Sequence, residues 1–212
     1  MKVSSSASYT KLLLRTDGDS ECWRSDDRAE IVRFVHECQF RPLTPESELD
    51  LSHGWVSPID PLNTEPGIFA IETGEYLTLS MRIDCWALPA KLLKARCAAR
   101  ERLYLDEHNK RKLFRSEKLA IKETVTRELR QSSVPKMDVV SVVVAASRGE
   151  VYIFSKSKRV LELVESLLEA TLDCRCVPMT PLSRAAEAGY EIGAESPLHG
   201  RIPTTFFSLE DA

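Results

Sequence analysis

The segment from residue 89 to residue 134 constrains the fold of this chain more than any other feature. It has two helical patterns, and a proline begins the first while another, Pro135, follows the second. Proline suits the start of a helix, where its missing N–H costs nothing. We therefore expect one helix over 89–107, a basic turn over 108–114, and a second helix over 116–131.

Few large apolar residues are available to bury this helix pair. The first helix has a narrow stripe that consists of Leu92, Ala95, Ala99 and Leu103. The second helix, which Ser116 is expected to cap, has a stripe that consists of Ile121, Val125 and Leu129. A thin stripe of small residues leaves most of a helix facing solvent. We predict that residues 89–134 project from the rest of the chain as an arm.

Strand patterns precede this segment. Residues 75–86 alternate apolar and polar side chains, which is typical of a strand, and a turn at 72–74 can pair them with 68–71. A short apolar run from Tyr9 to Leu14 is a candidate first strand. Between them, residues 43–67 predict an irregular connection with a short strand around Trp55.

A second group of elements follows the segment. Residues 138–146 and 150–154 predict a hairpin whose loop offers Gly149 for a left-handed position. Ser157 is expected to cap a strongly amphipathic helix, with an apolar face that consists of Val160, Leu161, Val164, Leu167 and Leu168. Cys174 to Val177 predicts a last strand, and the polar chain from Thr180 onward predicts a loosely packed tail.

One further helix is expected over 27–38, capped by Ser25 or Asp26, with an apolar face that consists of Ile31, Phe34 and Val35. Strands adjacent in sequence form hairpins, and helices are interspersed among them. The order predicts an α+β fold with antiparallel sheets, in which 1–183 form the folded region and 184–212 a polar tail.

The charges are unevenly divided. The whole chain has a formal net charge of −3, yet residues 91–136 carry a surplus of basic over acidic side chains. Such asymmetry suggests a polyanion-facing element on an acidic body. We expect the phosphate-binding side chains to be the basic ones in this segment: Lys91, Lys94, Arg102, Lys110, Arg111, Lys112, Arg115, Lys118, Lys122 and Lys136.

Other classes of protein fit the sequence poorly. The apolar runs are too short to span a bilayer, and no secretory signal is visible. The six cysteines contain no Cys-x-x-Cys pair, and the four histidines show no ligand spacing, so we expect reduced cysteines, no zinc and no cofactor. Nucleophile elbows and phosphate-binding glycine loops are absent. Asp84 is an acid on a strand without a visible partner, which is too little for a metal-dependent nuclease.

Two alternatives remain beside a phosphate-binding arm. A charged helix pair is often only a solvated surface, held by ion pairs such as the one that the spacing of Glu123 and Arg127 allows. The basic helices could instead bind an acidic protein.

Trp55 and Trp86 could stack on bases, although tryptophan more often fills the core. No motif for reading bases is visible, so nucleic-acid binding would be largely independent of sequence, and RNA presents the same phosphates.

An ordered series of short motifs resembles the RdgC family of recombination-associated proteins. The series consists of Phe40-Arg41-Pro42, Gly54-Trp55-Val56-x-Pro58, Leu88-Pro89, the basic linker into Ser116-Glu117-Lys118, the hairpin, the helix over 158–172, and Val177-Pro178-Met179-Thr180-Pro181-Leu182. The resemblance covers about residues 9–183. It implies a cytoplasmic, nucleoid-associated, non-enzymatic bacterial protein that binds single- and double-stranded DNA and restrains RecA-promoted recombination.

The resemblance also bears on assembly and on the site. It implies a homodimer closed into a ring with a basic lining, and among the candidates it points first to Lys110, Lys112, Lys118 and Lys122. Longer members of the family continue with a C-terminal portion that helps to close the ring, whereas this sequence ends at Ala212. The alternatives to a closed ring are an open clamp, a dimer formed through another surface, or loss of the RecA-related role.

Overall fold

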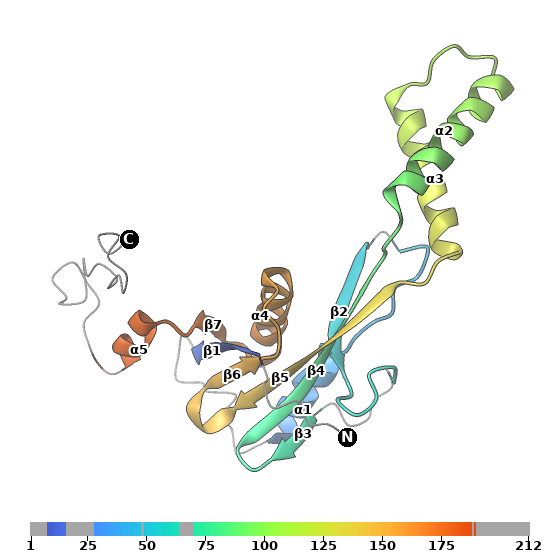
Figure 1. Ribbon diagram of the computed structural model, residues 1–212. Helices are drawn as coiled ribbons and strands as arrows, with labels where there is room; N and C mark the ends of the chain where they lie inside the picture. The colour runs from blue at the N-terminus through green and yellow to red at the C-terminus, as the bar shows by residue number, and fades with distance from the viewer. Residues whose placement is uncertain (1–7, 16–27, 48, 64–69, 188, 190–212) are drawn as a thin grey trace, which may run out of the picture.

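The computed structural model of the protein describes residues 8–15, 28–47, 49–63, 70–187 and 189. It is an α+β fold built on one seven-stranded antiparallel sheet (Figure 1). The strands lie in the order β2-β4-β5-β6-β1-β7, and β3 also pairs with β4. Their bounds are β1 Thr10–Arg15, β2 Leu51–Val56, β3 Ala70–Thr73, β4 Tyr76–Cys85, β5 Lys136–Ala145, β6 Glu150–Ile153 and β7 Arg175–Pro178.

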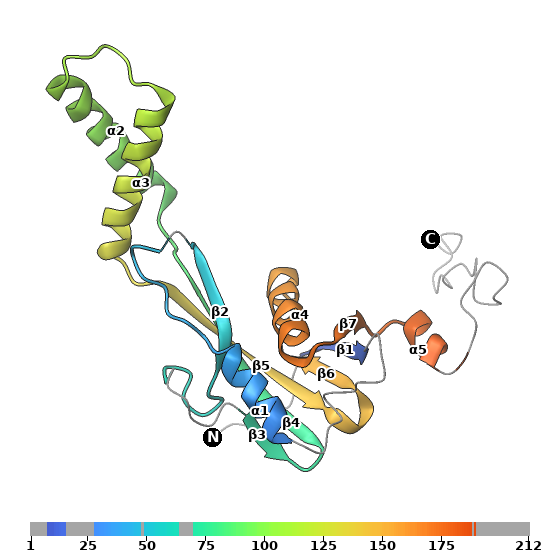
Figure 2. The same cartoon turned by 180° about the vertical axis from the view of Figure 1, so that it is seen from behind.

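Helices divide into those that cover the sheet and those that leave it. The bounds are α1 Arg28–Glu37, α2 Ala90–Glu107, α3 Arg115–Gln131, α4 Lys158–Leu172 and α5 Pro181–Glu187. Helices α1 and α4 contact each other, and Figure 2 shows α1 in front of β4. Helices α2 and α3 project from the end of the long strands β4 and β5 (Figure 1). We call them and their connection, residues 89–134, the arm, and the rest of the described chain the body.

The core of the body lies between the sheet and α4. It contains alternate residues of the strands, such as Leu79, Met81 and Val142, packed against Val164 and Leu168. Alternation places every second side chain of a strand on one face, so this pattern assigns one face of the sheet to the helices. The predicted apolar face of α4 is confirmed, since Val164, Leu167 and Leu168 are buried.

Trp55 fastens the sheet to α4 from inside this core. Its side chain is fully buried, and its indole N–H donates to the Thr171 hydroxyl at 2.8 Å. The hypothesis that this tryptophan fills the core is confirmed. Its neighbour Gly54 leaves no room for a side chain, because a Cβ there would lie 2.6 Å from the Phe40 backbone. The Phe40 N–H donates to the Trp55 carbonyl, so this close approach adds residues 38–40 to the sheet edge.

Most expected elements are present with small shifts at their ends. The hairpin of β5 and β6 is confirmed, and Gly149 adopts the expected left-handed conformation with φ of 60°. Ser157 does precede α4, but its side chain makes no capping hydrogen bond. The proposed caps Ser25 and Asp26, residues 68–69 of the expected strand, and residues 188 and 190–212 of the tail lie outside the described residues.

The prediction of a loose chain from Thr180 onward is wrong for α5. Thr180 and Ser183 bond reciprocally, since the Ser183 N–H donates to the Thr180 hydroxyl at 3.1 Å and the Thr180 N–H to the Ser183 hydroxyl at 2.7 Å. Pro181 occupies the first helical position, which it suits. The capping residues Thr180 and Ser183 are visible in the sequence, and they favour a helix here although the composition is polar.

Candidate nucleic-acid interface

The arm has a small hydrophobic seam of its own. Ile121, Val125 and Leu129 of α3 are buried, as predicted. Their partners on α2 are Leu93, Cys97 and Tyr104, with Leu88 and Leu113 at the ends. The predicted stripe on α2 is wrong, because Leu92 and Leu103 are 43% and 54% exposed. The observed contacts are made by Leu93, Cys97 and Tyr104, which bury more apolar area than the alanines of the predicted stripe would.

The tip of the arm is organised by Glu117. Its carboxylate accepts the Phe114 N–H at 2.8 Å and the Lys110 ammonium at 2.5 Å. These bonds lower the pKa of Glu117, chiefly through Lys110, and raise the pKa of Lys110. The expected cap Ser116 is wrong: α3 begins at Arg115, one residue earlier, so Ser116 lies within the first turn and Glu117 caps the helix instead.

The base of the arm is fixed to the body by Arg130. This arginine is 8% exposed, and its guanidinium donates to the Ser47 carbonyl at 2.6 Å and to the Asp50 carboxylate. It also lies 5.9 Å from the ring centroid of Trp86, a half-buried tryptophan whose backbone N–H donates to the Asp50 carbonyl. Arg130 therefore serves the structure, and sequence reasoning counted it only as one more positive charge.

The predicted phosphate-binding side chains are all exposed on the arm or at its base. Lys91 and Arg102 each lie two residues before a packing residue of α2, which turns them roughly 200° away from α3. Lys118 and Lys122 flank the buried stripe of α3, as expected. Lys136 begins β5, opposite Cys85. The cations thus surround the arm rather than line a single face.

Ion pairs leave most of these charges available. In the arm and Lys136, all of which the structure describes, ion pairs join Arg100 to Glu128, Lys110 to Glu117, and Arg130 to Asp50 of the body. The predicted pair of Glu123 and Arg127 does not form. The remaining cations have no carboxylate within ion-pair distance: Lys91, Lys94, Arg96, Arg102, Arg111, Lys112, Arg115, Lys118, Lys122, Arg127 and Lys136.

Asp84, the acid considered for a nuclease, has a partner. It is 4% exposed and receives two hydrogen bonds from the Arg82 guanidinium, at 2.8 and 2.7 Å. That guanidinium in turn lies 4.5 Å from the Phe40 ring centroid. Asp84 is thus neutralised by an arginine of its own strand, and it belongs to no group of three or more possible metal ligands among the described residues.

Neither a metal-binding cluster nor a membrane-spanning helix is found among the described residues. Within the described ranges, no group of three or more His, Cys, Asp or Glu side chains is placed to hold a metal ion. The same residues include no helix with the length and apolar character needed to cross a bilayer.

Comparison with known proteins agrees with the motifs noted in the sequence. No curated protein sequence shows significant similarity to the chain. A family model described as "RdgC: Putative exonuclease, RdgC" matches residues 19–191, which is most of the chain and includes the whole arm. The protein therefore belongs to the RdgC family, which associates it with recombination.

Proposed function

We propose that the protein binds DNA without strong sequence preference, by placing the exposed cations of the arm against backbone phosphates. The observation that carries this proposal is the set of arm cations that have no carboxylate partner. A projecting arm can approach a polyanion while the acidic body stays away from it. Long Lys and Arg side chains also bury their stems and still present their charge to phosphate oxygens.

Titration of labelled DNA over a salt series tests this function. If about six cations meet phosphates, the logarithm of the affinity falls with the logarithm of salt concentration at a slope near −5. Fluorescence anisotropy with random-sequence duplex and single strand should show this slope for both probes. Absence of binding at low salt would favour the alternative, an arm that binds an acidic protein.

Charge reversal on the arm tests the site. We choose Lys112, Lys118 and Lys122, each changed to Glu, and leave Lys110 unchanged because its reversal would place a carboxylate beside Glu117. The affinity for DNA should fall by at least a hundredfold at moderate salt and the slope should become shallower. The matched control changes Arg41, Arg159 and Arg184 of the body to Glu. Equal loss in both variants would refute the assignment to the arm.

The family description names an exonuclease, so the same samples decide between binding and cleavage. We expect end-labelled DNA to remain intact after incubation with the protein and Mg²⁺ or Mn²⁺. Progressive shortening that needs the metal would overturn the non-enzymatic proposal.

Assembly and biological role are proposed from the same family. We expect a homodimer in the bacterial cytoplasm, associated with the nucleoid, that restrains a RecA-type recombinase by occupying its DNA. Light scattering gives the mass in solution, and a strand-exchange assay gives the inhibition. The arm reversal should relieve that inhibition while the mass stays the same.

A further inference from the structure

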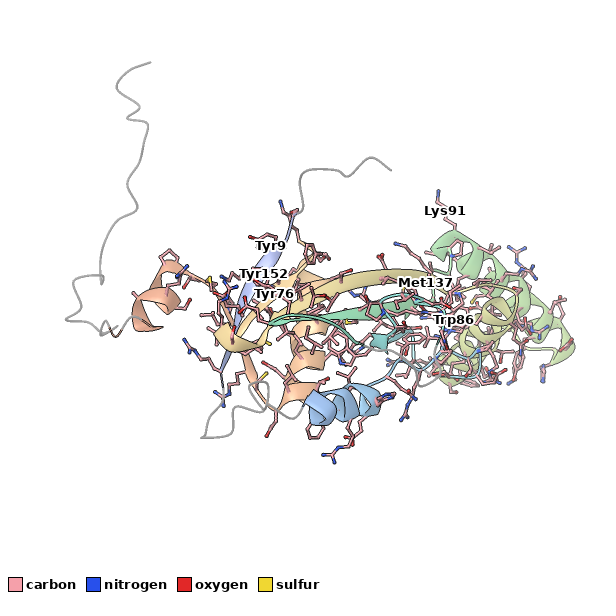
Figure 3. All side chains as sticks on the ribbon, turned by 90° about the horizontal axis from the view of Figure 1, so that it is seen from below. Tyr9, Tyr76, Trp86, Lys91, Met137 and Tyr152 are labelled. Atoms are coloured by element: carbon pink, nitrogen blue, oxygen red, sulfur yellow. The ribbon has the colours of Figure 1, made fainter. Side chains whose placement is uncertain are left out.

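The face of the sheet opposite α1 and α4 carries a group of aromatic rings. Lys11, Tyr152, Val143 and Thr78 stand opposite one another in register, one residue out of phase with the core residues of the same strands. They therefore point away from the core. Figure 3 shows Tyr9, Tyr76 and Tyr152 toward this side of the sheet, with α1 and α4 on the other side. We call this side the open face.

Two of the rings on the open face are strongly exposed. Tyr9 and Phe154 are 50% and 41% exposed, and their centroids are 6.1 Å apart. Tyr152 lies beneath this pair in an edge contact with Tyr9, at 5.3 Å. Exposed aromatic rings that are neighbours on a sheet are unusual for a surface that meets only water.

The supporting ring, Tyr152, is held in place from several sides. Its hydroxyl donates to one oxygen of the Glu150 carboxylate at 2.6 Å, while Lys11 donates to the other oxygen at 2.6 Å. The Lys11 ammonium also lies 5.2 Å from the centroid of the Tyr152 ring. A ring that is already immobilised loses little entropy when a flat ligand stacks beside it.

The composition around the rings favours a nucleic acid over an apolar protein surface. Thr78 and Val143 lie level with Tyr152, Ser141 lies level with Phe154, and Val139 continues the same face of β5 toward the base of the arm. Lys91, one of the arm cations without a carboxylate partner, extends toward the same side of the sheet (Figure 3). Exposed rings, with hydroxyl groups beside them and cations nearby, are the features of protein surfaces that bind single strands by stacking on the bases.

We propose that the open face is a stacking site for the unpaired bases of single-stranded DNA, with Tyr9 and Phe154 as the stacking residues. The proposal rests on the proposed function, because the arm supplies the attraction to phosphates. It adds a second kind of contact, since two cations beside the rings are already neutralised: Lys11 by Glu150 and Arg148 by Glu75. A duplex hides the faces of its bases and gains nothing from this site.

The two kinds of contact differ in their dependence on salt. Phosphate contacts release counterions and so weaken steeply as salt rises, whereas stacking of neutral rings releases none. Loss of the open face should therefore lower the affinity for a single strand by the same factor at every salt concentration. Loss of arm cations should instead change the slope.

The central variant changes Tyr9 and Phe154 together to Leu. Leucine keeps an apolar cover over Tyr152 but removes the flat π surface, so folding is retained and stacking is lost. The probes are a 20-nucleotide oligo(dT), a strand of equal length with abasic sites, and a random duplex. We expect about a tenfold loss of affinity for oligo(dT), unchanged affinity for the other two probes, and an unchanged salt slope.

A second variant reports the contact directly. Tyr9→Trp should show quenched and shifted indole fluorescence when oligo(dT) is added, and little change with the abasic strand. This measurement does not depend on whether the leucine variant folds.

The outcomes separate the open face from the arm. Equal affinity of wild type and the leucine variant for oligo(dT), with no quenching in the tryptophan variant, overturns the stacking site while DNA binding by the arm stands. A loss that is the same for duplex and single strand also overturns it. Failure of the wild type to bind any of the three probes refutes the proposed function itself.

Discussion

The body and the arm are folded by different means. In the body, a sheet and α4 bury large side chains such as Trp55, Leu79 and Leu168 almost completely. In the arm, only α3 has buried residues, and α2 has none. The body draws its stability from apolar area removed from water, which scales with the area buried. The arm has little such area, and so keeps most of its surface for charges.

This difference explains why hydrogen bonds and ion pairs hold the arm at both of its ends. Glu117 closes the tip by binding Lys110 and the start of α3, and Arg130 holds the base against Asp50 and Trp86. Helices in proteins draw most of their stability from tertiary packing, and α2 and α3 bury little apolar area. A few hydrogen bonds at the two ends therefore fix the arm in place, whereas the body is held together by its apolar core.

The largest expected effect comes from a charge in the core of the body. Val164→Asp places a carboxylate at a fully buried position between α4 and the sheet. An unpaired buried charge costs far more than an average substitution, so we expect a loss of more than about 4 kcal/mol and global unfolding. Circular dichroism should show the loss of both helix and strand signals.

Ser166→Asp is the matched control for that variant, because it adds the same charge to an exposed position of α4. It should melt like the wild type. A normal melting temperature for Val164→Asp would show that this face of α4 is not part of the core.

The same substitution in the arm should have a confined effect. Val125 is 2% exposed in the seam of α3, so Val125→Asp should separate α2 from α3. Hydrogen exchange should accelerate throughout 90–131 while the strands of the body keep their protection. DNA affinity should fall, because the cations lose their fixed arrangement.

Glu123→Asp is the control here, since it keeps the charge of α3 and changes an exposed side chain. Loss of protection in β4 and β5 on Val125→Asp would contradict the comparison, because it would mean that arm and body unfold as one unit.

The sequence predicted the body better than the arm, for a physical reason. Alternation over 75–86 and the apolar face of α4 are strong patterns, because each residue buries a large area on a known side. On α2 the predicted stripe contains two alanines, which bury little area, so periodicity could not choose between Leu92 and its neighbour Leu93. The tip failed similarly, because Ser116 and Glu117 are both good capping residues and only the start of the helix decides between them.

The candidate site was predicted in composition rather than in arrangement. The charge surplus identified the arm, and the structure places those cations around it on both helices. The sequence does not show which cations are paired with a carboxylate of the protein and which are free to bind phosphate. Arg130 and Lys110 look like their neighbours in the sequence, and only distant partners such as Asp50 set them apart. The open face was missed because Tyr9 and Phe154 are far apart in the chain.

A moderate effect is expected where arm and body meet. Arg130→Ala removes the hydrogen bonds to Ser47 and Asp50 but leaves Asp50 exposed to water, so the cost should be about 1–2 kcal/mol. Hydrogen exchange at the Trp86 amide, which donates to Asp50, should accelerate.

Arg127→Ala is the control for that variant, as Arg127 is an exposed arginine of the same helix. It should weaken DNA binding slightly without changing exchange at Trp86. Equal exchange in the two variants would show that the chain connections alone orient the arm.

The smallest expected effect is on the pH dependence of stability, through two carboxylates that accept several hydrogen bonds, one in the body and one in the arm. In the body, hydrogen bonds from Ser147 and then Arg148 and Tyr76 lower the pKa of Glu75 from 4.5 to about 2. In the arm, Lys110 and the Phe114 N–H lower the pKa of Glu117. A depressed pKa in the folded state stabilises the protein above the unfolded pKa, and this stabilisation is lost as pH falls toward the folded pKa.

Acid should therefore act on both regions through these groups. For Glu75 the loss runs from about pH 4.5 down to about pH 2, so Glu75→Gln should flatten the fall of the melting temperature over that window. For Glu117→Gln, the flattening should appear in the exchange of 108–118, while the melting temperature of the body stays the same as in the wild type. Glu123→Gln, at an exposed site without an ion pair, should flatten neither. If Glu117→Gln changed the melting temperature as much as Glu75→Gln, the tip of the arm would be coupled to the sheet, and the arm could not be regarded as a region that unfolds by itself.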